Sequence, residues 1–164
     1  IINFTRLIIV PCANPDGVYA GVIKNGYGRC NAQGIDLNRD FDYNWSYIGV
    51  PRFQTGYKPF SAPESQILRD FVLIEKPDVV LDFHGWLNCA YSQNPELKTM
   101  LSRTLNLGEE KPADPKYNPW QGYFSGWASQ YAQSALIEYP LTETDQLIEK
   151  TIQALDQLIQ TIHD

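Results

Sequence analysis

The stretch "PDVVLDFHGW", residues 77–86, decides the expected fold. Residues 79–81 belong to a short apolar run between a proline and a glycine, which is the pattern of a buried strand. A helical pattern over 61–76 precedes this strand, and another over 95–108 follows it. Because strands alternating with helices are typical of α/β domains, we expect a central, largely parallel or mixed sheet with flanking helices.

The ends of these two helices carry recognisable signals. Ser61 and Glu64 match a capping box at the start of the first helix, and Pro77 ends it. Pro95 opens the second helix and Gly108 ends it. These signals support a helix on either side of the strand.

The C-terminal part of the chain continues the alternation. Residues 125–133 predict a short helix, 134–140 an apolar strand, and 142–164 an amphipathic helix with one apolar stripe. No internal repeat or linker-like composition interrupts the sequence. We therefore expect a single domain over residues 1–164.

The N-terminal part is less regular. Residues 6–17, "RLIIVPCANPDG", predict a short buried strand that ends in a turn at 14–17. From residue 18 to 59 no periodicity is sustained, which indicates a long structured loop region of a kind that is usually functional. Because the strand pattern begins almost at the first residue, we expect the chain to start inside a domain and to be N-terminally truncated.

The charge balance limits the partners. A net charge of −6 argues against nucleic acid and anionic membranes, because both bind basic surfaces. No apolar run approaches the ~20 residues of a membrane span. The three cysteines show no CxxC spacing, so we expect free buried thiols, with a disulfide at Cys30 as the alternative in an oxidising compartment. No signal-peptide pattern occurs, and the sequence assigns no compartment.

Two polar residues lie at the ends of the expected strands. His84 ends the first strand, and Glu138 follows the apolar run of the second. A glutamate inside a sheet is costly unless it is paired or reaches a site, and ligands bind at the carboxyl ends of strands in α/β sheets. We therefore expect one shared site. The alternative is a hydrogen-bonded histidine and a structural ion pair.

A second concentration of polar residues is "GIDLNRDFDYNW", residues 34–45. Asp36, Asn38 and Arg39 fall within four positions there. A surface ion pair between Asp36 and Arg39 is the simplest interpretation, and most such pairs contribute little to stability. The alternative is a binding site within the loop region.

Five segments of the chain, taken in order, resemble motifs of the zinc carboxypeptidases of the carboxypeptidase A type. The segment 34–45 is similar to the family's "G-V-D-L-N-R-N-F…W" signature. "DFHGW" resembles the strand that carries the third zinc ligand, and "ALIEYP" resembles the strand that carries the catalytic glutamate. The other two are the turn "NPDG" and the helix start "FSAPESQ". The resemblance implies a zinc-carboxypeptidase-like fold.

The resemblance also implies roles in substrate binding. Asn38 and Arg39 match the pair that binds the substrate's terminal carboxylate, a role that suits a guanidinium fork beside a neutral amide. Arg29 is the best match to the arginine that polarises the scissile carbonyl, with Lys24 as another basic residue of the loop. Asp36 resembles the acid that orients the family's first zinc-binding histidine.

Metal binding and catalysis are implied for three further residues. His84 matches a zinc ligand, and Glu138 matches the general base that acts on the zinc-bound water. Tyr117 matches the family's mobile substrate-binding tyrosine by its spacing from Gly122, and Tyr123 is the alternative. Either tyrosine also fits packing against a neighbouring tryptophan.

One motif of the family is absent from these 164 residues. The family's other two zinc ligands come from an H-x-x-E sequence, which occurs nowhere in the chain, whereas catalytic zinc sites usually have three protein ligands. We therefore expect zinc in the complete domain but not in this chain alone, which we expect to be inactive. The chain is then a fragment of a working peptidase, a metal-free peptide-binding relative, or a chain whose partner supplies the missing ligands.

The implied reaction is zinc-dependent hydrolysis of a peptide bond next to a free C-terminal carboxylate. Bacterial relatives with short loops often act on cell-wall peptides, and the short link from Arg29 to Arg39 is similar to theirs. Hydrolysis of N-acyl amino acids by a related deacylase is the alternative. The expected partner is a peptide with a free C-terminal carboxylate. Four tryptophans fit core and loop packing better than a sugar-stacking cleft: Trp45, Trp86, Trp120 and Trp127.

Overall fold

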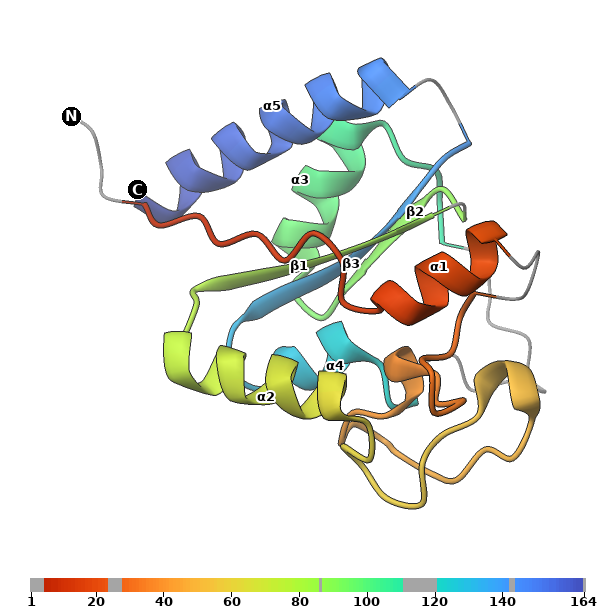
Figure 1. The fold of residues 1–164 in the computed structure, drawn as a ribbon. Helices are drawn as coiled ribbons and strands as arrows, with labels where there is room; N and C mark the ends of the chain where they lie inside the picture. Colours follow the sequence, from red (N-terminus) through yellow and green to blue (C-terminus); the bar gives the residue numbers. More distant parts are fainter. Residues whose placement is uncertain (1–4, 24–27, 86, 111–120, 142–143, 164) are drawn as a thin grey trace. The chain divides into compact units, whose positions relative to one another are not determined.

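The computed structural model describes residues 5–23, 28–85, 87–110, 121–141 and 144–163 (Figure 1). In chain order its elements are α1 (Pro15–Ile23), η1 (Leu37–Arg39), η2 (Pro51–Phe53), α2 (Pro63–Glu75), β1 (Val79–Gly85), β2 (Cys89–Ser92), α3 (Pro95–Leu105), α4 (Phe124–Ala128), β3 (Gln133–Tyr139) and α5 (Thr144–His163). They form two compact units. The first unit comprises Ile1–Ile9, Leu81–Lys111 and Ala135–Asp164, and the second comprises Val10–Val80 and Pro112–Ser134.

A mixed sheet of three strands is formed by the described residues. The strand order is β1-β3-β2, and β2 pairs antiparallel with β3, with Cys89 opposite Glu138 and Ser92 opposite Ala135. The expected α/β fold with flanking helices is confirmed. The sequence did not predict β2, because its four residues are too few to show a period of two.

In the first unit, α3 packs against β2 and α5. Leu97, Leu101 and Leu105 recur every fourth residue along α3 and are buried, as expected for a helix with one face on a core. Asn94 caps the helix, because its side-chain oxygen accepts the backbone N–H of Glu96 and of the residue that follows it. The helix predicted over 95–108 is therefore confirmed, although it ends three residues earlier.

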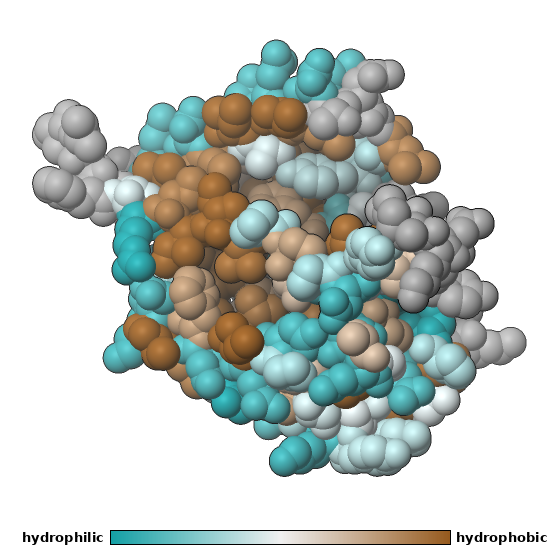
Figure 2. All heavy atoms as spheres, viewed as in Figure 1, coloured by the Kyte–Doolittle hydropathy of each residue, from teal (hydrophilic) through white to brown (hydrophobic). Residues whose placement is uncertain are grey.

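The C-terminal helix α5 is confirmed too, but its predicted apolar stripe is only partly covered. Ala154 and Leu158 are buried, whereas Ile148 and Ile152 are exposed. Apolar side chains are also exposed on the face of the molecule drawn in Figure 2. Although α5 has 20 residues, no helix in the described part of the chain is both long and apolar enough to cross a membrane.

The core of the second unit is aromatic. Phe41 is 1% exposed and lies within 6 Å of the rings of Phe60, Phe124 and Trp127, at centroid distances of 5.6, 5.0 and 5.7 Å. Val72 of α2 belongs to the same cluster. Because Phe41 follows η1 by only two residues, this core anchors η1 to the rest of the unit. Trp127 serves core packing, as expected.

The buried strand predicted near the N-terminus is wrong. Residues 7–10 form no strand and are exposed, Ile9 by 72%. An apolar run becomes a buried strand only when neighbouring strands pair with it and cover it, and none does so among the described residues. The turn predicted at 14–17 is the first turn of α1, where Asn14 Oδ1 accepts the N–H of Gly17 at 3.0 Å.

The helix predicted from Ser61 is confirmed as α2, but its capping box is wrong. Ser61 Oγ bonds to the backbone of Lys58 instead. The start of α2 is satisfied by Asp40, whose Oδ2 accepts the N–H of Ala62 at 2.8 Å and the hydroxyl of Ser65 at 2.6 Å. A carboxylate from a distant segment therefore supplies the negative charge that a helix N-terminus favours.

Candidate substrate-binding and catalytic site

The short helix η1 is built around Asp36. This carboxylate accepts the backbone N–H of Asn38 at 3.2 Å, which is the usual bond of an N-cap residue. The backbone N–H of Asp36 donates to the carbonyl of Gln54 at 2.8 Å. Asp36 is 2% exposed, so the polar residues of 34–45 are not explained by a surface ion pair between Asp36 and Arg39.

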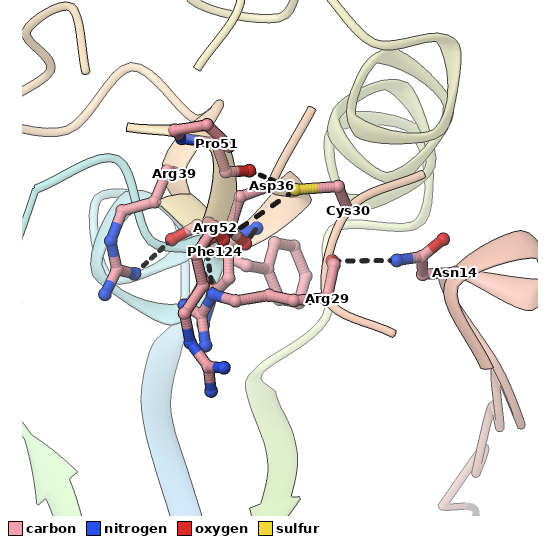
Figure 3. A network of polar contacts seen from close by, with 9 residues as sticks. Asn14, Arg29, Cys30, Asp36, Arg39, Pro51, Arg52 and Phe124 are labelled. Carbon is pink, nitrogen blue, oxygen red and sulfur yellow. Dashed lines mark hydrogen bonds and ion pairs between the residues drawn. The ribbon is translucent and has the colours of Figure 1, made fainter. Parts of the chain in front are cut away.

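Arg29 is the ion-pair partner of Asp36 (Figure 3). Its Nε lies 2.5 Å from Asp36 Oδ2, and its side chain is 31% exposed. Burial raises the pKa of the Asp36 carboxyl above its ordinary value, while the charges of Arg29 and Arg39 act in the opposite direction. The buried carboxylate of Asp36 therefore fixes the position of the partly exposed guanidinium of Arg29.

Asn38 and Arg39 are held by η1 itself and by the segment that precedes α4. Asn38 Oδ1 accepts the backbone N–H of Phe124 at 2.8 Å. Arg39 Nη1 donates to the backbone carbonyl of Asn38 at 2.5 Å. Burial is the main cause that lowers the pKa of Arg39. The negative charge of Asp36 raises this pKa, and the positive charge of Arg29 lowers it further. The structure therefore brings Arg29, Asp36, Asn38 and Arg39 together.

Gly122 permits the close approach of two chain segments at this site. It has φ +64°, and a Cβ there would collide with the backbone of Arg39. The N–H of Phe41 donates to Gly122 O at 3.0 Å, and the N–H of Gly122 donates to Tyr43 O at 2.7 Å. Together with the bond from Phe124 to Asn38, these contacts join η1 and residues 121–124 into one hydrogen-bonded frame.

Four residues named from the sequence lie outside the described part of the chain: Lys24, Trp86, Tyr117 and Trp120. Tyr123, the alternative to Tyr117, is 9% exposed and packs edge-on against Tyr43 with ring centroids 5.2 Å apart. This arrangement suits packing better than movement toward a substrate.

His84 and Glu138 lie in the first unit, on the neighbouring strands β1 and β3. His84 Nε2 lies 3.0 Å from Asp82 Oδ1. Glu138 stands opposite Cys89 of β2 in the register, and its Oε2 is shielded from solvent. The sheet thus carries an imidazole and a carboxylate on adjacent strands.

The fit of zinc to these donors can be tested within the described residues. No three side chains of His, Cys, Asp or Glu among them lie close enough together to hold a metal ion. His84 and Asp82 supply one imidazole and one carboxylate, whereas a catalytic zinc ion takes three protein ligands and a water. The described donors therefore do not fit zinc by themselves.

The structure shows contacts near Arg29 for three residues to which the sequence assigned no role in the site: Arg52, Phe53 and Cys30. The Phe53 ring lies 5.0 Å from Arg29 Cζ and 5.6 Å from Arg52 Cζ. Cys30 Sγ donates to the carbonyl oxygens of Pro51 and Arg52, at 3.5 and 3.7 Å. The sequence shows an arginine next to a phenylalanine at 52–53. Because this pair is more than 20 positions from residues 29–30, it does not predict a contact with them.

These observations define an α/β domain with polar groups on adjacent strands and a buried aspartate-arginine pair in a long loop. The chain belongs to the zinc carboxypeptidase family, Peptidase_M14, whose family model matches residues 1–118. Membership agrees with the five motifs on which the resemblance was based.

Two curated relatives are similar in sequence. Murein peptide amidase A of Escherichia coli strain K12 is 30% identical over 179 residues, covering 96% of this chain and 68% of that protein. Bacteriocin BCN5 of Clostridium perfringens is 39% identical over 145 residues, covering 84% of this chain. The chain spans only 16% of the bacteriocin's length.

Solved structures agree with the fold. The crystal structure of murein-tripeptide amidase MpaA from Escherichia coli O157 matches with a TM-score of 0.67 and 30% identity, covering 90% of this chain and 65% of that one. The carboxypeptidase A of Helicoverpa armigera matches with a TM-score of 0.68 and 20% identity, covering 88% and 50%. The second match supports the fold alone.

Proposed function

We propose that this protein acts on peptides with a free C-terminal carboxylate and hydrolyses the adjacent peptide bond. The observation that carries the proposal is the frame that holds Asn38 and Arg39 beside the Arg29–Asp36 pair. A guanidinium matches a carboxylate with two parallel hydrogen bonds, and half-burial of Arg39 strengthens such a contact. The similarity to the murein peptide amidases supports a cell-wall peptide as the substrate.

Each of the proposed site residues has a distinct role. Arg39 and Asn38 bind the terminal carboxylate, with Tyr117 as a further substrate contact. Arg29, oriented by Asp36, polarises the scissile carbonyl and stabilises the oxyanion. Glu138 takes a proton from the attacking water and passes it to the leaving amine.

Zinc is the cofactor that family membership implies, with His84 as one proposed ligand and Asp36 as the proposed orienter of another imidazole. Because the described donors do not fit the ion by themselves, the chain's contribution is limited to the roles given above. We expect the purified 164-residue chain to retain little zinc after dialysis. Stoichiometric zinc in metal analysis would show that further donors exist, with Asp82 and Glu138 the first to be examined.

A second candidate function is peptide binding without hydrolysis. The observation that favours this alternative is the bond from the N–H of Phe124 to Asn38 Oδ1, which holds the proposed carboxylate-binding residue through protein groups alone. N-acyl amino acid hydrolysis is the other reaction that the resemblance leaves open, and it also uses a carboxylate-bearing substrate.

A matched pair of peptides tests the proposal. One peptide ends in a free carboxylate and the other in an amide, and both binding and hydrolysis are measured. We expect the acid to be preferred, with Arg39→Ala removing the preference. Binding of the acid without cleavage by a domain with a complete set of zinc ligands would support the peptide-binding alternative, and equal treatment of acid and amide would overturn the proposal.

A further inference from the structure

Two exposed tyrosines form a parallel pair in the loop region of the second unit. Tyr47 is 59% exposed and Tyr57 is 93% exposed. Their ring centroids lie 6.2 Å apart, and their planes differ by only 6°. A single exposed apolar side chain is ordinary on a protein surface. Two parallel rings that both remain open to solvent form a flat aromatic surface, which we call the tyrosine platform.

Buried groups hold the backbone of this platform. Thr55 is 2% exposed and bonds to Ile48 twice: its N–H donates to Ile48 O, and its Oγ1 accepts the N–H of Ile48, both at 3.1 Å. These bonds join the two chain segments that carry the tyrosines. Buried Gln121 also donates from Nε2 to Ser46 O, next to Tyr47. Because the platform is held in this way without a ligand, binding one orders it little.

The two rings differ in how they meet their own loop. A Cβ on Gly49 would lie 3.3 Å from Tyr47 Oη, so the ring of Tyr47 lies close to the backbone of Gly49. A Cβ on Gly56 would lie 2.0 Å from Ser61 Cβ, so only a glycine fits directly before Tyr57. Tyr47 therefore rests against its loop, whereas Tyr57 projects into solvent.

Size and charge limit the ligands that suit the platform. An aromatic side chain buries about 150–250 Å², so two rings offer roughly 300–500 Å², whereas a stable protein interface buries about 800 Å² on each partner. Single-stranded nucleic acid needs a positively charged groove besides stacking, but the net charge is −6. Proline-rich peptides bind in grooves lined by aromatic rings, and Tyr57 projects from the surface. A neutral ligand with a flat apolar face fits best.

We propose that the tyrosine platform binds a neutral saccharide chain by stacking. A pyranose ring carries C–H groups on its faces and hydroxyl groups around its rim, so it can lie on an aromatic ring while its hydroxyls stay in water. Tyrosine suits such a ligand because it joins an apolar ring to a polar hydroxyl. Two parallel rings can each take one sugar unit. This binding goes beyond the proposed hydrolysis and uses none of the residues assigned to it.

The test is an NMR titration of the isotope-labelled 164-residue chain. The probes are cellotetraose and tetra-N-acetylchitotetraose, two neutral tetrasaccharides that differ in their acetamido groups. We expect the saccharide to shift the backbone amide signals of Ile48 and Thr55 and to saturate these shifts. A response to both probes would show that the pyranose ring is sufficient. A response to tetra-N-acetylchitotetraose alone would show that the acetamido group contributes to the stacked contact.

Three variants locate the contact. Tyr57→Ala should weaken binding roughly 10-fold, because stacking on one aromatic ring is lost. Tyr57→Phe keeps the ring and should bind nearly as well as the wild type. Tyr19→Ala is the matched control, since Tyr19 is 63% exposed on α1 and does not belong to the platform. Its dissociation constant should equal that of the wild type.

Two results would overturn the inference: no shift with either tetrasaccharide, or undiminished binding by folded Tyr57→Ala. Should Tyr57→Ala fail to fold by circular dichroism, Tyr47→Ala replaces it, and undiminished binding there counts equally against the inference. Decaproline is titrated in the same way. Shifts with decaproline and with neither saccharide would assign the platform to a proline-rich peptide. The proposed function is tested separately by the acid and amide peptides, so either proposal can fail alone.

Discussion

The loop around η1 and the strand ends of β1 and β3 hold their candidate residues by different means. In the loop, Asp36 caps η1, pairs with Arg29 and is almost fully buried, so side-chain bonds create the geometry. On the strands, His84 and Glu138 are placed by the backbone pairing of the sheet. In the loop, the side chains of candidate site residues also make the bonds that hold the local fold. On the strands, the backbone pairing holds the fold and the candidate side chains are separate from it.

This difference has a consequence for substitutions. A change in a side chain of the loop alters both geometry and stability, because side-chain bonds hold the loop together with its backbone bonds. A change at a strand end can alter chemistry while the strand keeps its position. The predictions below use this contrast, beginning with the largest expected effect.

The largest effect is expected at Glu138. In a domain with a complete set of zinc ligands, Glu138→Gln keeps the shape of the side chain but removes the base, so turnover on the acid peptide should fall by ~10²–10⁴-fold. Thermal unfolding should change little, because the strand is held by its backbone. Steady-state kinetics and a melting curve measure both quantities, and near-normal turnover would remove Glu138 from the catalytic role.

The second effect concerns Arg39 in the loop. Arg39→Ala removes a charged hydrogen-bond donor, worth about 1.5–3 kcal/mol, so in a domain with a complete set of zinc ligands KM for the acid peptide should rise roughly 10- to 100-fold. The amide peptide serves as the control, since its KM should barely change. A rise of the same size for both peptides would show that the variant disturbs the frame rather than the contact with a carboxylate.

A pair of asparagines compares the two regions for stability. In the loop, buried Asn31 accepts the N–H groups of Gln33 and Ile35 and donates to Glu64 at 2.9 Å. Asn31→Ala should lower the free energy of unfolding by about 1–3 kcal/mol. In the first unit, Asn94→Ala removes a helix cap and should cost about 1 kcal/mol. Urea unfolding measures both, and a larger loss in Asn94→Ala would contradict the expected order of the two losses.

The smallest effect is the pH dependence that Asp36 contributes. Because burial raises its pKa in the folded state, folding takes up a proton in the pH range above the ordinary carboxyl pKa. The contribution of Asp36 is then fully present below that value and is lost as pH rises through the folded-state pKa. The unfolding free energy of the wild type minus that of Asp36→Asn should therefore fall with rising pH. A difference that rises with pH would mean that Arg29 outweighs burial.

The parts of the molecule that could be predicted are those with local signals. β1, β3, α2, α3 and α5 each carry a periodic pattern or an end signal within their own residues. The candidate site residues of the loop were recognisable for a similar reason, since Asp36, Asn38 and Arg39 belong to one short motif. Such signals do not depend on the rest of the chain.

The remaining features depend on contacts between distant segments. The apolar pattern at 7–10 indicates a strand only if neighbours cover it, and its side chains are exposed. Asp40 caps α2 across more than 20 positions, and no local pattern predicts that bond. Arg29 lies over the ring of Phe53, and Cys30 Sγ bonds to the backbone of η2, contacts that the sequence does not reveal.

The close contact at Gly122 has a consequence for hydrogen exchange. The amide hydrogen of Phe124 is bonded to the Asn38 side chain, 86 positions away in sequence, and can exchange with solvent only when that bond opens. The amides of Phe41 and Gly122 are bonded across the same contact, so all three should open as one cooperative unit. A carboxylate bound to Arg39 would stabilise the closed form and slow the exchange of Phe124, although that residue donates nothing to the ligand.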